Sequence, residues 1–444
     1  MSYDWRRIRD EPLSAYMGRL GPTWIAGAIA AGPATMVTVV TAGASFGYSL
    51  LWVVIIAAIF GALAQYLAMR VGLLTGTGLV SAVEERIGST WAWLLVIDVV
   101  LAAGLAQLVI MKTTADVSEI ITGVDARIWG IAWAILLAVG LGFGGYRFLE
   151  TLAKVLVAGV VIAFVASLTI VDIDITAATA GLTPTIPAGI DGALVAAAVL
   201  GGAVHVTLVT MQSYTMRSRG WTSEEYGLAT FDILTSMIIA FGAYSLAIFL
   251  VAASVLHDPA EEIVELNAIT AAQALEPALG TIGHWLFLLG LLGAAVSTLG
   301  GNTFVPPYVI ADKLDIERDV ADKRYRWLVV AVALLSAGGA FIEGATFFEL
   351  LVFVLAFGLV GTPFALALVM YLANDEGAVP ERATIPANIG GLALISVASF
   401  LAYQFVRDQA PFTSALDWFV LGFAITFGIA TLVLAVKFLS ERWG

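Results

Sequence analysis

Cysteine is absent from this chain of 444 residues, and histidine occurs three times. Without cysteine there can be no disulfide bond, thiolate metal site or cysteine nucleophile. His205, His257 and His284 are too scattered for a zinc motif of the HExxH type. Nucleotide-binding loops, nucleophile elbows and metal-hydrolase motifs are missing as well. The sequence therefore gives no support for an enzyme, and we expect no bound cofactor.

Charged residues are also few, at 12% of the chain, whereas 60% of the residues are hydrophobic and the mean hydropathy is +0.95. A soluble domain is not this apolar over such a length, so we expect a protein that crosses the lipid bilayer many times. The net charge of −13 must then lie in loops and chain ends. We interpret it as adaptation to a saline setting, and no nucleic-acid partner is expected. The opening MSYDWRRIRDEPLS has no apolar core, so we expect no cleaved signal peptide.

About twelve apolar runs are long enough to span a bilayer, which predicts an all-α membrane protein. The connections between them are short, so we expect one integral membrane domain over 1–444. The runs lie near residues 20–44, 48–70, 91–112, 128–146, 150–171, 190–214, 229–255, 281–311, 327–345, 347–373, 386–405 and 415–438.

Basic residues gather in alternate connections, and this alternation orients the chain. They are dense before the first run and in KLDIERDVADKRYR at 313–326, whereas the connection 257–280 is acidic and has neither lysine nor arginine. Cytoplasmic loops of membrane proteins are enriched in lysine and arginine. We therefore predict a multi-pass protein of the cell membrane with both termini in the cytoplasm and with 257–280 outside.

The first run and its continuation, LGPTWIAGAIAAGPATMVTVVTAGASFGY at 20–48, are interrupted at Gly32-Pro33. Proline removes a backbone donor and clashes with the preceding turn, so a helix should break near 31–35. Broken backbone at mid-membrane depth is tolerated where protein or a water-filled cavity satisfies its peptide groups, and in secondary transporters substrate binds there.

The sixth run has a second, softer interruption signal. It contains the pair Gly201-Gly202 followed by the intramembrane His205. Two glycines weaken a helix by roughly 1 kcal/mol each relative to alanine, although they also serve close helix packing. Runs one and six occupy corresponding places if 20–171 forms one five-helix repeat and 190–373 its inverted copy, with two further helices in 386–438.

Several segments resemble the natural resistance-associated macrophage protein (Nramp) family of divalent metal transporters. The likeness lies in LGP at 20–22, AGASFGYSLLW at 42–52, GYRFLETLAKVL at 145–156, FDILTSMIIAFGAYSLAIFLVAASVLH at 231–257, VSTLGGNTFVPPYVIADKL at 296–314 and TPFALALVMYLAND at 362–375. The resemblance covers runs one to ten. It implies the leucine-transporter fold, with two inverted five-helix repeats plus two extra C-terminal helices.

The two motifs that ligate metal in this family are altered here. The DPGN motif of the first helix is matched by Gly32-Pro33-Ala34-Thr35, which keeps the proline but loses both side-chain ligands. The MPH motif of the sixth helix is matched by His205-Val206-Thr207, with a one-residue shift left open, so that Gly202 would occupy the position of the backbone-carbonyl ligand. The glutamine ligand of the tenth helix is missing, with Gly361 or Leu355 nearby.

The family's proton path is also reduced. One of its acids in the third helix corresponds to Asp98, whereas its later acidic positions read Leu105 and Leu108. Asp98 and His205 are therefore the two candidates for proton coupling. His205 is also the single candidate metal ligand, because the other matched positions carry no imidazole, thioether or carboxylate.

We predict that seven residues of runs one and six bind the substrate, namely Gly32, Pro33, Ala34, Thr35, Gly202, His205 and Thr207. Thr38 and Thr210 could line the same cavity. The expected function is an Nramp-like secondary transporter working by alternating access, with a divalent metal cation as default substrate. Because the site lacks carboxylates, the cation would be carried partly hydrated, with weak or absent proton coupling and without micromolar manganese binding. Transport of a small organic or neutral solute is one alternative, and a non-transporting membrane sensor is another; the sequence indicates no oligomeric state.

Overall fold

The computed structural model describes residues 3, 5–10, 12, 14–16, 32–143, 147–187, 190–218, 220–257 and 266–443, which form helices and connecting segments. The first part of run one (20–31) and the acidic stretch 258–265 lie outside the described residues. Nine stretches of the described chain are long and apolar enough to cross a membrane, and one of them, Pro33–Thr75, holds two of the predicted runs. The all-α expectation is confirmed.

The helices follow the predicted runs in chain order. Runs one to five give α3 (Pro33–Phe46), α4 (Leu51–Thr75), α6 (Ser89–Thr122), α7 (Ala126–Phe143) and α8 (Arg147–Ser167). Runs six to eight give divided helices: α10 (Ile190–Val204) with α11 (Val206–Ser218), α12 (Tyr226–Leu234) with α13 (Gly242–Val255), and α16 (Thr281–Thr303) with α17 (Val305–Lys313). The last four give α18 (Lys323–Leu335), α19 (Phe347–Asn374), α20 (Ile385–Asp408) and α21 (Ala415–Trp443).

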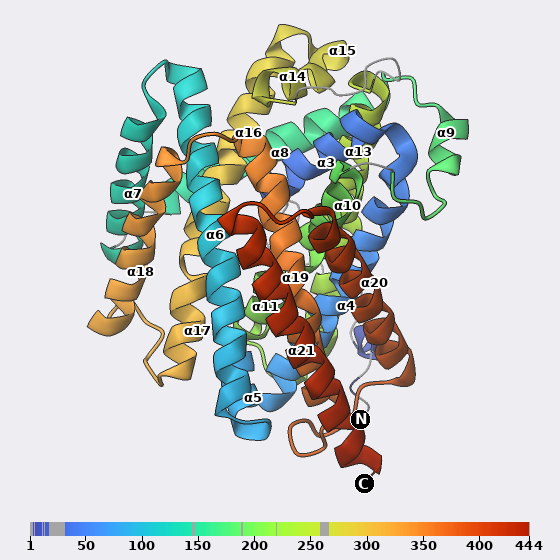
Figure 1. The fold of residues 1–444 in the computed structure, drawn as a ribbon, viewed down its shortest axis with the longest axis vertical. Coiled ribbons are helices and arrows are strands. Elements are labelled where there is room, and N and C mark those ends of the chain that lie inside the picture. Colours follow the sequence, from blue (N-terminus) through green and yellow to red (C-terminus); the bar gives the residue numbers. More distant parts are fainter. Residues whose placement is uncertain are drawn as a thin grey trace.

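Short helices cap the two ends of the bundle. The helix α5 (Leu79–Arg86) lies at the same end as the C-terminal turns of α21, whereas α14 (Ala268–Ala272) and α15 (Glu276–Leu279) lie at the other end (Figure 1). A further short helix, α9 (Ile175–Ala180), follows α8. Connections that the basic residues assign to opposite sides of the membrane thus lie at opposite ends of the molecule. Which end faces the cytoplasm stays a prediction.

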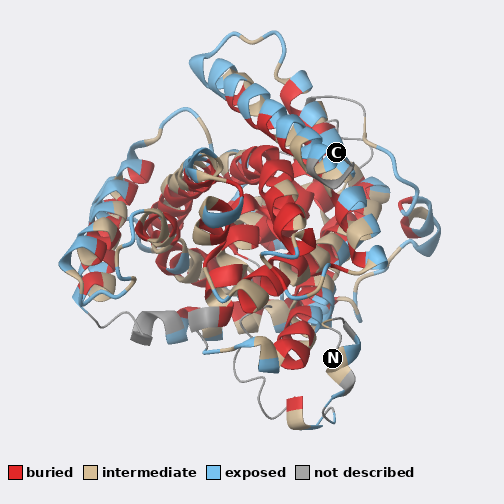
Figure 2. Cartoon of the chain, turned by 90° about the horizontal axis from the view of Figure 1, so that it is seen from below, coloured by how far each residue is buried: buried red, intermediate tan, exposed pale blue. Residues whose placement is uncertain are grey.

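Burial separates the helices into a central and a peripheral set. Buried positions gather in the middle of the molecule and exposed ones on its outer helices (Figure 2). The apolar windows of α10–α11 and of α19 are 89% buried, against 28% for α7 and α21. The exposed positions of the outer helices are themselves apolar, such as Ile131 and Ile135 on α7 and Ile425 and Ile429 on α21. These faces suit contact with lipid chains rather than with water.

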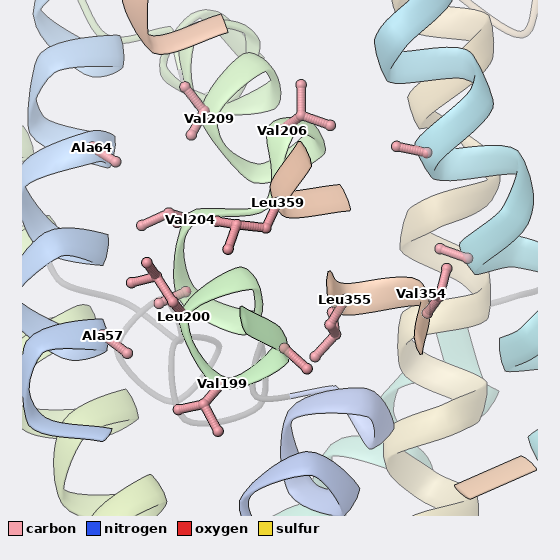
Figure 3. Packing of buried hydrophobic residues seen from close by; sticks show 14 of the residues in the cluster. Ala57, Ala64, Val199, Leu200, Val204, Val206, Val209, Val354, Leu355 and Leu359 are labelled. Atoms are coloured by element: carbon pink, nitrogen blue, oxygen red, sulfur yellow. The ribbon is translucent and has the colours of Figure 1, made fainter. Parts of the chain in front are cut away.

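The centre of the core is the packing of α10 between α4 and α19. Figure 3 shows Val199 and Leu200 of α10 near Ala57 of α4 and Leu355 of α19. The side chains of these four residues are at most 9% exposed. Because α10 is enclosed on both sides, the point at which this helix ends is fixed inside the protein.

The seventh run contains a π-helical segment, η4 (Thr235–Phe241), between α12 and α13. Met237 on this segment receives a hydrogen bond on its sulfur from Gln65 of α4, at 3.1 Å. A π-helical turn holds one residue more than an α-helical turn and often marks a functional region. The seventh run is therefore continuous, but the π-helical segment rotates α13 about the helix axis relative to its position in an uninterrupted α-helix.

Arg70, near the end of α4, is fully buried and joins four segments. Its guanidinium donates to the backbone carbonyls of Tyr3, Glu381 and Arg382 and to the hydroxyl of Tyr226 at the start of α12. Carbonyl and hydroxyl oxygens offset the desolvation of this charge. The contacts fasten an N-terminal residue and the connection after α19 to the same end of the bundle.

A charged pair holds α5 to the end of α19. Nε of Arg86 lies 2.8 Å from Oδ2 of Asp375. Burial opposes ionisation of Asp375, but hydrogen bonds from Arg86 and from the backbone N–H of Gly377 outweigh it, so the pKa of Asp375 lies below its ordinary value of 3.8. This pair lies at the periphery, away from the helix interruptions.

Candidate functional site

The helix α3 begins at Pro33, where the sequence predicts the break in run one. Gly32 precedes it with extended backbone (φ −62°, ψ 176°) and provides no side-chain cap. The first intrahelical bond runs from Met36 N–H to the Gly32 carbonyl, at 3.1 Å. Proline suits this first helical position because its missing N–H has no intrahelical partner in any case. The next two N–H groups, of Ala34 and Thr35, have no partner within the helix either.

The sixth run is interrupted at His205, between α10 and α11. The His205 carbonyl accepts from the N–H groups of Leu208 and Val209, at 2.9 and 3.1 Å. Its ring Nδ1 accepts from Thr207 N–H at 3.4 Å and lies 2.8 Å from Thr207 Oγ1. The histidine side chain thus caps α11 in the way that an asparagine or serine commonly does. An Nδ1 that accepts leaves the proton of the neutral ring on Nε2.

Nε2 of His205 is directed at the backbone of α19, around Val354 and Gly358. A Cβ atom built on Gly358 would lie 1.7 Å from it, so glycine is required there to admit the ring. Nε2 makes no hydrogen bond of normal geometry with the described residues. On the other side of the break, Thr362 Oγ1 donates to the carbonyl of Val204, at 2.9 Å. The interruption is therefore held by α19.

The glycine pair of run six does not form the break, which corrects the sequence prediction. Gly201 and Gly202 lie inside the last turns of α10. A Cβ atom on Gly201 would lie 2.2 Å from the carbonyl oxygen of Leu355, and one on Gly202 would lie 3.0 Å from Thr35 Oγ1. The glycines bring α10 close to α19 and α3, and the chain is interrupted only where the histidine can cap the next helix.

The start of α3 and the interruption at His205 face one cavity of about 570 Å³. Its described walls come from α3, α6, α7, α8, α10, α11, α16, α17 and α19. All seven predicted substrate-binding residues line it: Gly32, Pro33, Ala34, Thr35, Gly202, His205 and Thr207. Sequence reasoning from runs one and six thus brought together residues that share a cavity wall; that they bind substrate stays a prediction.

Other predicted positions lie outside this cavity. Thr38 and Thr210 are buried, but they are not among its described lining residues. Asp98 is fully buried against α19, where a Cβ atom on Gly361 would lie 1.9 Å from its Oδ1. Neither carboxylate oxygen of Asp98 has a hydrogen-bond partner among the described residues. The structure does not bring Asp98 to the cavity wall beside His205, and its role in coupling stays a prediction.

Sequence reasoning missed the contribution of α16, α8 and the middle of α11. The wall also holds Thr298 and Asn302 of α16, Lys154 of α8 and Met211 of α11. The signal for α16 was present, because Thr298 and Asn302 stand four residues apart in an apolar helix and share a face. Met211 supplies a thioether to the wall, which matching the family motifs alone does not reveal.

The donors around the cavity are almost all neutral. Its described lining residues include hydroxyls, an imidazole, an amide and one lysine, but neither aspartate nor glutamate. In the part of the chain that the structure describes, no three histidine or acidic side chains are grouped so as to hold a metal ion. A tightly bound, dehydrated divalent cation would need such charged ligands.

Comparison with solved structures identifies the fold. The manganese transporter of Eremococcus coleocola matches 97% of this chain and 96% of its own with a TM-score of 0.70 at 16% identity. MhsT, solved in complex with L-phenylalanine, matches 87% of this chain and 98% of its own with a TM-score of 0.58 at 16% identity. The fold is the leucine-transporter fold of two inverted five-helix repeats, as the resemblance implies.

Comparison of sequences identifies the family. The divalent metal cation transporter MntH of Yersinia pestis (strain Pestoides F) is 31% identical over 306 residues, which make up 65% of this chain and 73% of that protein. The family model for natural resistance-associated macrophage protein-like sequences matches residues 23–408. That match extends over the interrupted helices and every described wall of the cavity. The chain belongs to the Nramp family.

Proposed function

We propose that this chain is a secondary transporter that carries a divalent metal cation by alternating access around α3 and α10–α11. The observation that carries the proposal is the cavity at which the start of α3 and the break between α10 and α11 meet, within the fold of the family. A relative with 31% identity is named a divalent metal cation transporter. The C-terminal end of a half-helix such as α10 carries carbonyls without partners inside the helix, and such ends suit coordination of a cation.

The cation is carried with water. Six first-shell waters occupy roughly 180 Å³ at about 30 Å³ each, which leaves ample room in a cavity of about 570 Å³. Magnesium and similar hard ions keep several waters when few carboxylates are offered. Hydroxyls such as those of Thr35 and Thr207 then bind the waters. Weak binding, with little preference for manganese, follows from the missing charge.

A small organic solute is the second candidate, and one observation favours it. The N-termini of α3 and α11 and the side chain of Lys154 reach the same cavity. Helix N-termini and a lysine attract a carboxylate group. MhsT, which shares the fold, was solved with L-phenylalanine. Under this alternative the transported solute is an amino acid or a similar carboxylate.

Uptake into proteoliposomes separates the two candidates. Purified protein is reconstituted, and uptake of Mg²⁺, Mn²⁺ and a set of amino acids is measured beside empty vesicles. The proposal expects saturable uptake of divalent cations with KM above the micromolar range. Uptake of an amino acid without any divalent cation would replace it by the second candidate. Calorimetry with the same solutes gives a transport-independent check.

We further propose that proton co-transport is weak or absent. Leu105 and Leu108 replace acids of the family's proton path, and Asp98 lies away from the described cavity wall. A pH-sensitive dye inside the proteoliposomes should therefore report little acidification during cation uptake. Stoichiometric acidification of the lumen would contradict this part of the proposal.

The orientation with cytoplasmic termini is also a proposal, supported by the alternating basic loops. The chain is free of cysteine, so single cysteines can be placed at Glu317 and Glu276, both exposed and in connections assigned to opposite sides. An impermeant thiol reagent added to intact cells should label Glu276→Cys and spare Glu317→Cys. The reverse labelling would invert the orientation. Positions 2 and 262 offer the same test outside the described residues.

A further inference from the structure

A chain of hydrogen bonds joins α6 to α16 beside the cavity. Nδ2 of Asn302 donates to the carbonyl of Ala103 at 2.9 Å and to Oε1 of Gln107 at 2.8 Å. Nε2 of Gln107 in turn donates to Oγ1 of Thr303 at 2.8 Å. Thr303 Oγ1 donates to the carbonyl of Leu299 at 2.7 Å. Gln107 is 2% exposed and Thr303 is fully buried.

The two end groups of this series of hydrogen bonds determine which atoms donate and which accept. The carbonyls of Ala103 and Leu299 can only accept, so the Asn302 atom facing Ala103 must be the NH₂ group and the Thr303 hydroxyl must donate to Leu299. With its hydrogen given to Leu299, Thr303 Oγ1 is an acceptor towards Gln107. The Gln107 amide is thereby oriented with its oxygen towards Asn302. No alternative amide orientation satisfies every bond.

This arrangement leaves one group of Asn302 for a ligand. Both amide hydrogens are bound to α6, while Asn302 lines the cavity and is partly exposed. The remaining group is the side-chain carbonyl oxygen, Oδ1, which is an acceptor only. Its partner must therefore be a cation or a hydrogen-bond donor, such as a water bound to a metal ion.

We propose that Oδ1 of Asn302 is a specificity-determining ligand of the transported divalent cation, bound directly or through one water of its shell. The proposal rests on the cation transport proposed above and adds a ligand from α16. Thr298, one turn away on the same helix and about 6 Å along its axis, lines the same wall. A Cβ atom on Gly32 would lie 2.8 Å from Thr298 Oγ1, so this wall reaches the interruption of run one.

The hydrogen-bond chain makes Gln107 a positioning residue. An amide that swings freely loses rotamer freedom when it binds an ion, whereas an amide already held does not. The bonds also polarise one another in the low-dielectric interior, which strengthens the oxygen as an acceptor. A neutral carbonyl oxygen is a hard ligand and suits magnesium or calcium better than soft transition metals.

Another part of the protein provides a matched control for this inference. Asn374 of α19 and Asn388 of α20 are joined by two reciprocal amide bonds, at 2.7 and 2.9 Å, away from the described cavity wall. Asn388→Leu therefore breaks an interhelical amide contact of the same kind without touching the cavity. A loss that arises only from weakened helix packing should be equal in both variants.

The experiment measures uptake of Mg²⁺ and Mn²⁺ by proteoliposomes, together with thermal stability. Asn302→Leu should raise KM for Mg²⁺ at least tenfold while lowering Tm no more than Asn388→Leu does. Gln107→Leu should raise KM by a smaller factor, because the oxygen remains but is no longer held. Asn302→Met replaces a hard oxygen by a soft thioether and should raise the ratio of Mn²⁺ to Mg²⁺ uptake, an effect that a purely structural role cannot produce.

The outcomes are distinguishable. If the wild-type protein takes up neither cation, the proposed cation transport is wrong and this inference falls with it. If the wild-type protein transports cations, but Asn302→Leu behaves like Asn388→Leu and Asn302→Met leaves the ratio unchanged, then Asn302 is only a packing residue. In that case the proposed function stands and the inference alone is overturned.

Discussion

The two helices that begin at the cavity, α3 and α11, start by different means. In run one, Pro33 starts α3, and the missing N–H of proline is a property of the residue itself. In run six, His205 caps α11 with its own ring, and this ring fits only because Gly358 of α19 leaves room for it. The start of α3 is thus set locally, whereas the start of α11 depends on a neighbouring helix. A break of the first kind can be located from sequence, and one of the second kind only approximately.

The largest effect in this comparison is expected at the glycine pair. Gly201→Ala would place a Cβ atom 2.2 Å from the Leu355 backbone oxygen, whereas Gly202→Ala meets the Thr35 hydroxyl at 3.0 Å. The Leu355 carbonyl, unlike a side chain, cannot rotate away from the added Cβ atom. We therefore expect Gly201→Ala to destabilise the protein by roughly 2–3 kcal/mol. Gly202→Ala should be nearly neutral, because a small shift of Thr35 is offset by the better helix propensity of alanine. Thermal unfolding in detergent compares the two variants, and equal losses would show that the close approach to the Leu355 carbonyl is not what requires glycine at position 201.

The next effect concerns selectivity, and it tests whether the two interruptions form one site. Gly32→Asp, Thr35→Asn and His205→Met together restore the ligand types of the family's motifs. Because a Cβ atom on Gly32 would lie 2.8 Å from Thr298 Oγ1, the design should include Thr298→Ala. We expect at least a tenfold gain in manganese affinity by calorimetry, about 1.4 kcal/mol.

The same design without Thr298→Ala is the control and should gain less. Tight manganese binding by the unaltered protein, lost in His205→Ala, would overturn the reading of this site as one without strong ligands. Met211 would then become the soft ligand to examine, since it lies on the same wall.

A smaller effect separates the capping role of His205 from any role in binding. His205→Ala removes the acceptor for the Thr207 N–H and should cost about 1 kcal/mol, as loss of a helix cap does. His205→Asn keeps a short side-chain acceptor and should recover most of that stability. If His205→Asn recovers stability but not substrate uptake, the ring has a second function in the cavity. If both variants are equally unstable, the cap is not what holds this interruption.

The smallest effect is expected far from either interruption, at the pair of Arg86 and Asp375. Its carboxylate has a lowered pKa, so the stability it contributes is present above the ordinary value of 3.8 and is lost as pH falls through the lower folded value. At pH 7, Asp375→Asn should cost only about 0.2–1 kcal/mol, as partly exposed ion pairs do. The difference in Tm between variant and wild type should shrink below pH 4. A difference that persists there would mean that the contact is not electrostatic.

The fold was predictable because it rests on patterns that lie within single segments. Apolar length gives the spans, and Pro33 gives the start of α3. The positions that face the cavity in runs one and six follow from where those helices break, and Gly32, Thr35, Gly202 and Thr207 all line it.

The other features of the site depend on contacts between helices, and the sequence does not show which helices are neighbours. The place of Gly201 is set by the carbonyl of Leu355, and that of Asp98 by the space at Gly361, both on α19. The ligand role that we propose for Asn302 depends on Gln107 on α6, which is more than a hundred residues away in the sequence. A resemblance to the family cannot supply these partners where the motifs themselves have changed.

The π-helical segment of the seventh run changes the rotation of α13 about the helix axis relative to α12. One residue advances an α-helix by about 100°, and η4 inserts one extra residue between α12 and α13. With it, Tyr226 at one end points at Arg70, while at the other end α13 packs its backbone near Phe249 against Gly43 of α3. Deleting one residue from 235–241 would leave the length and hydropathy of the span almost unchanged. It would nevertheless rotate α13 relative to α12 about the helix axis, so that both contacts could no longer form together. A single added residue therefore sets the directions in which the two ends of the seventh run present their side chains.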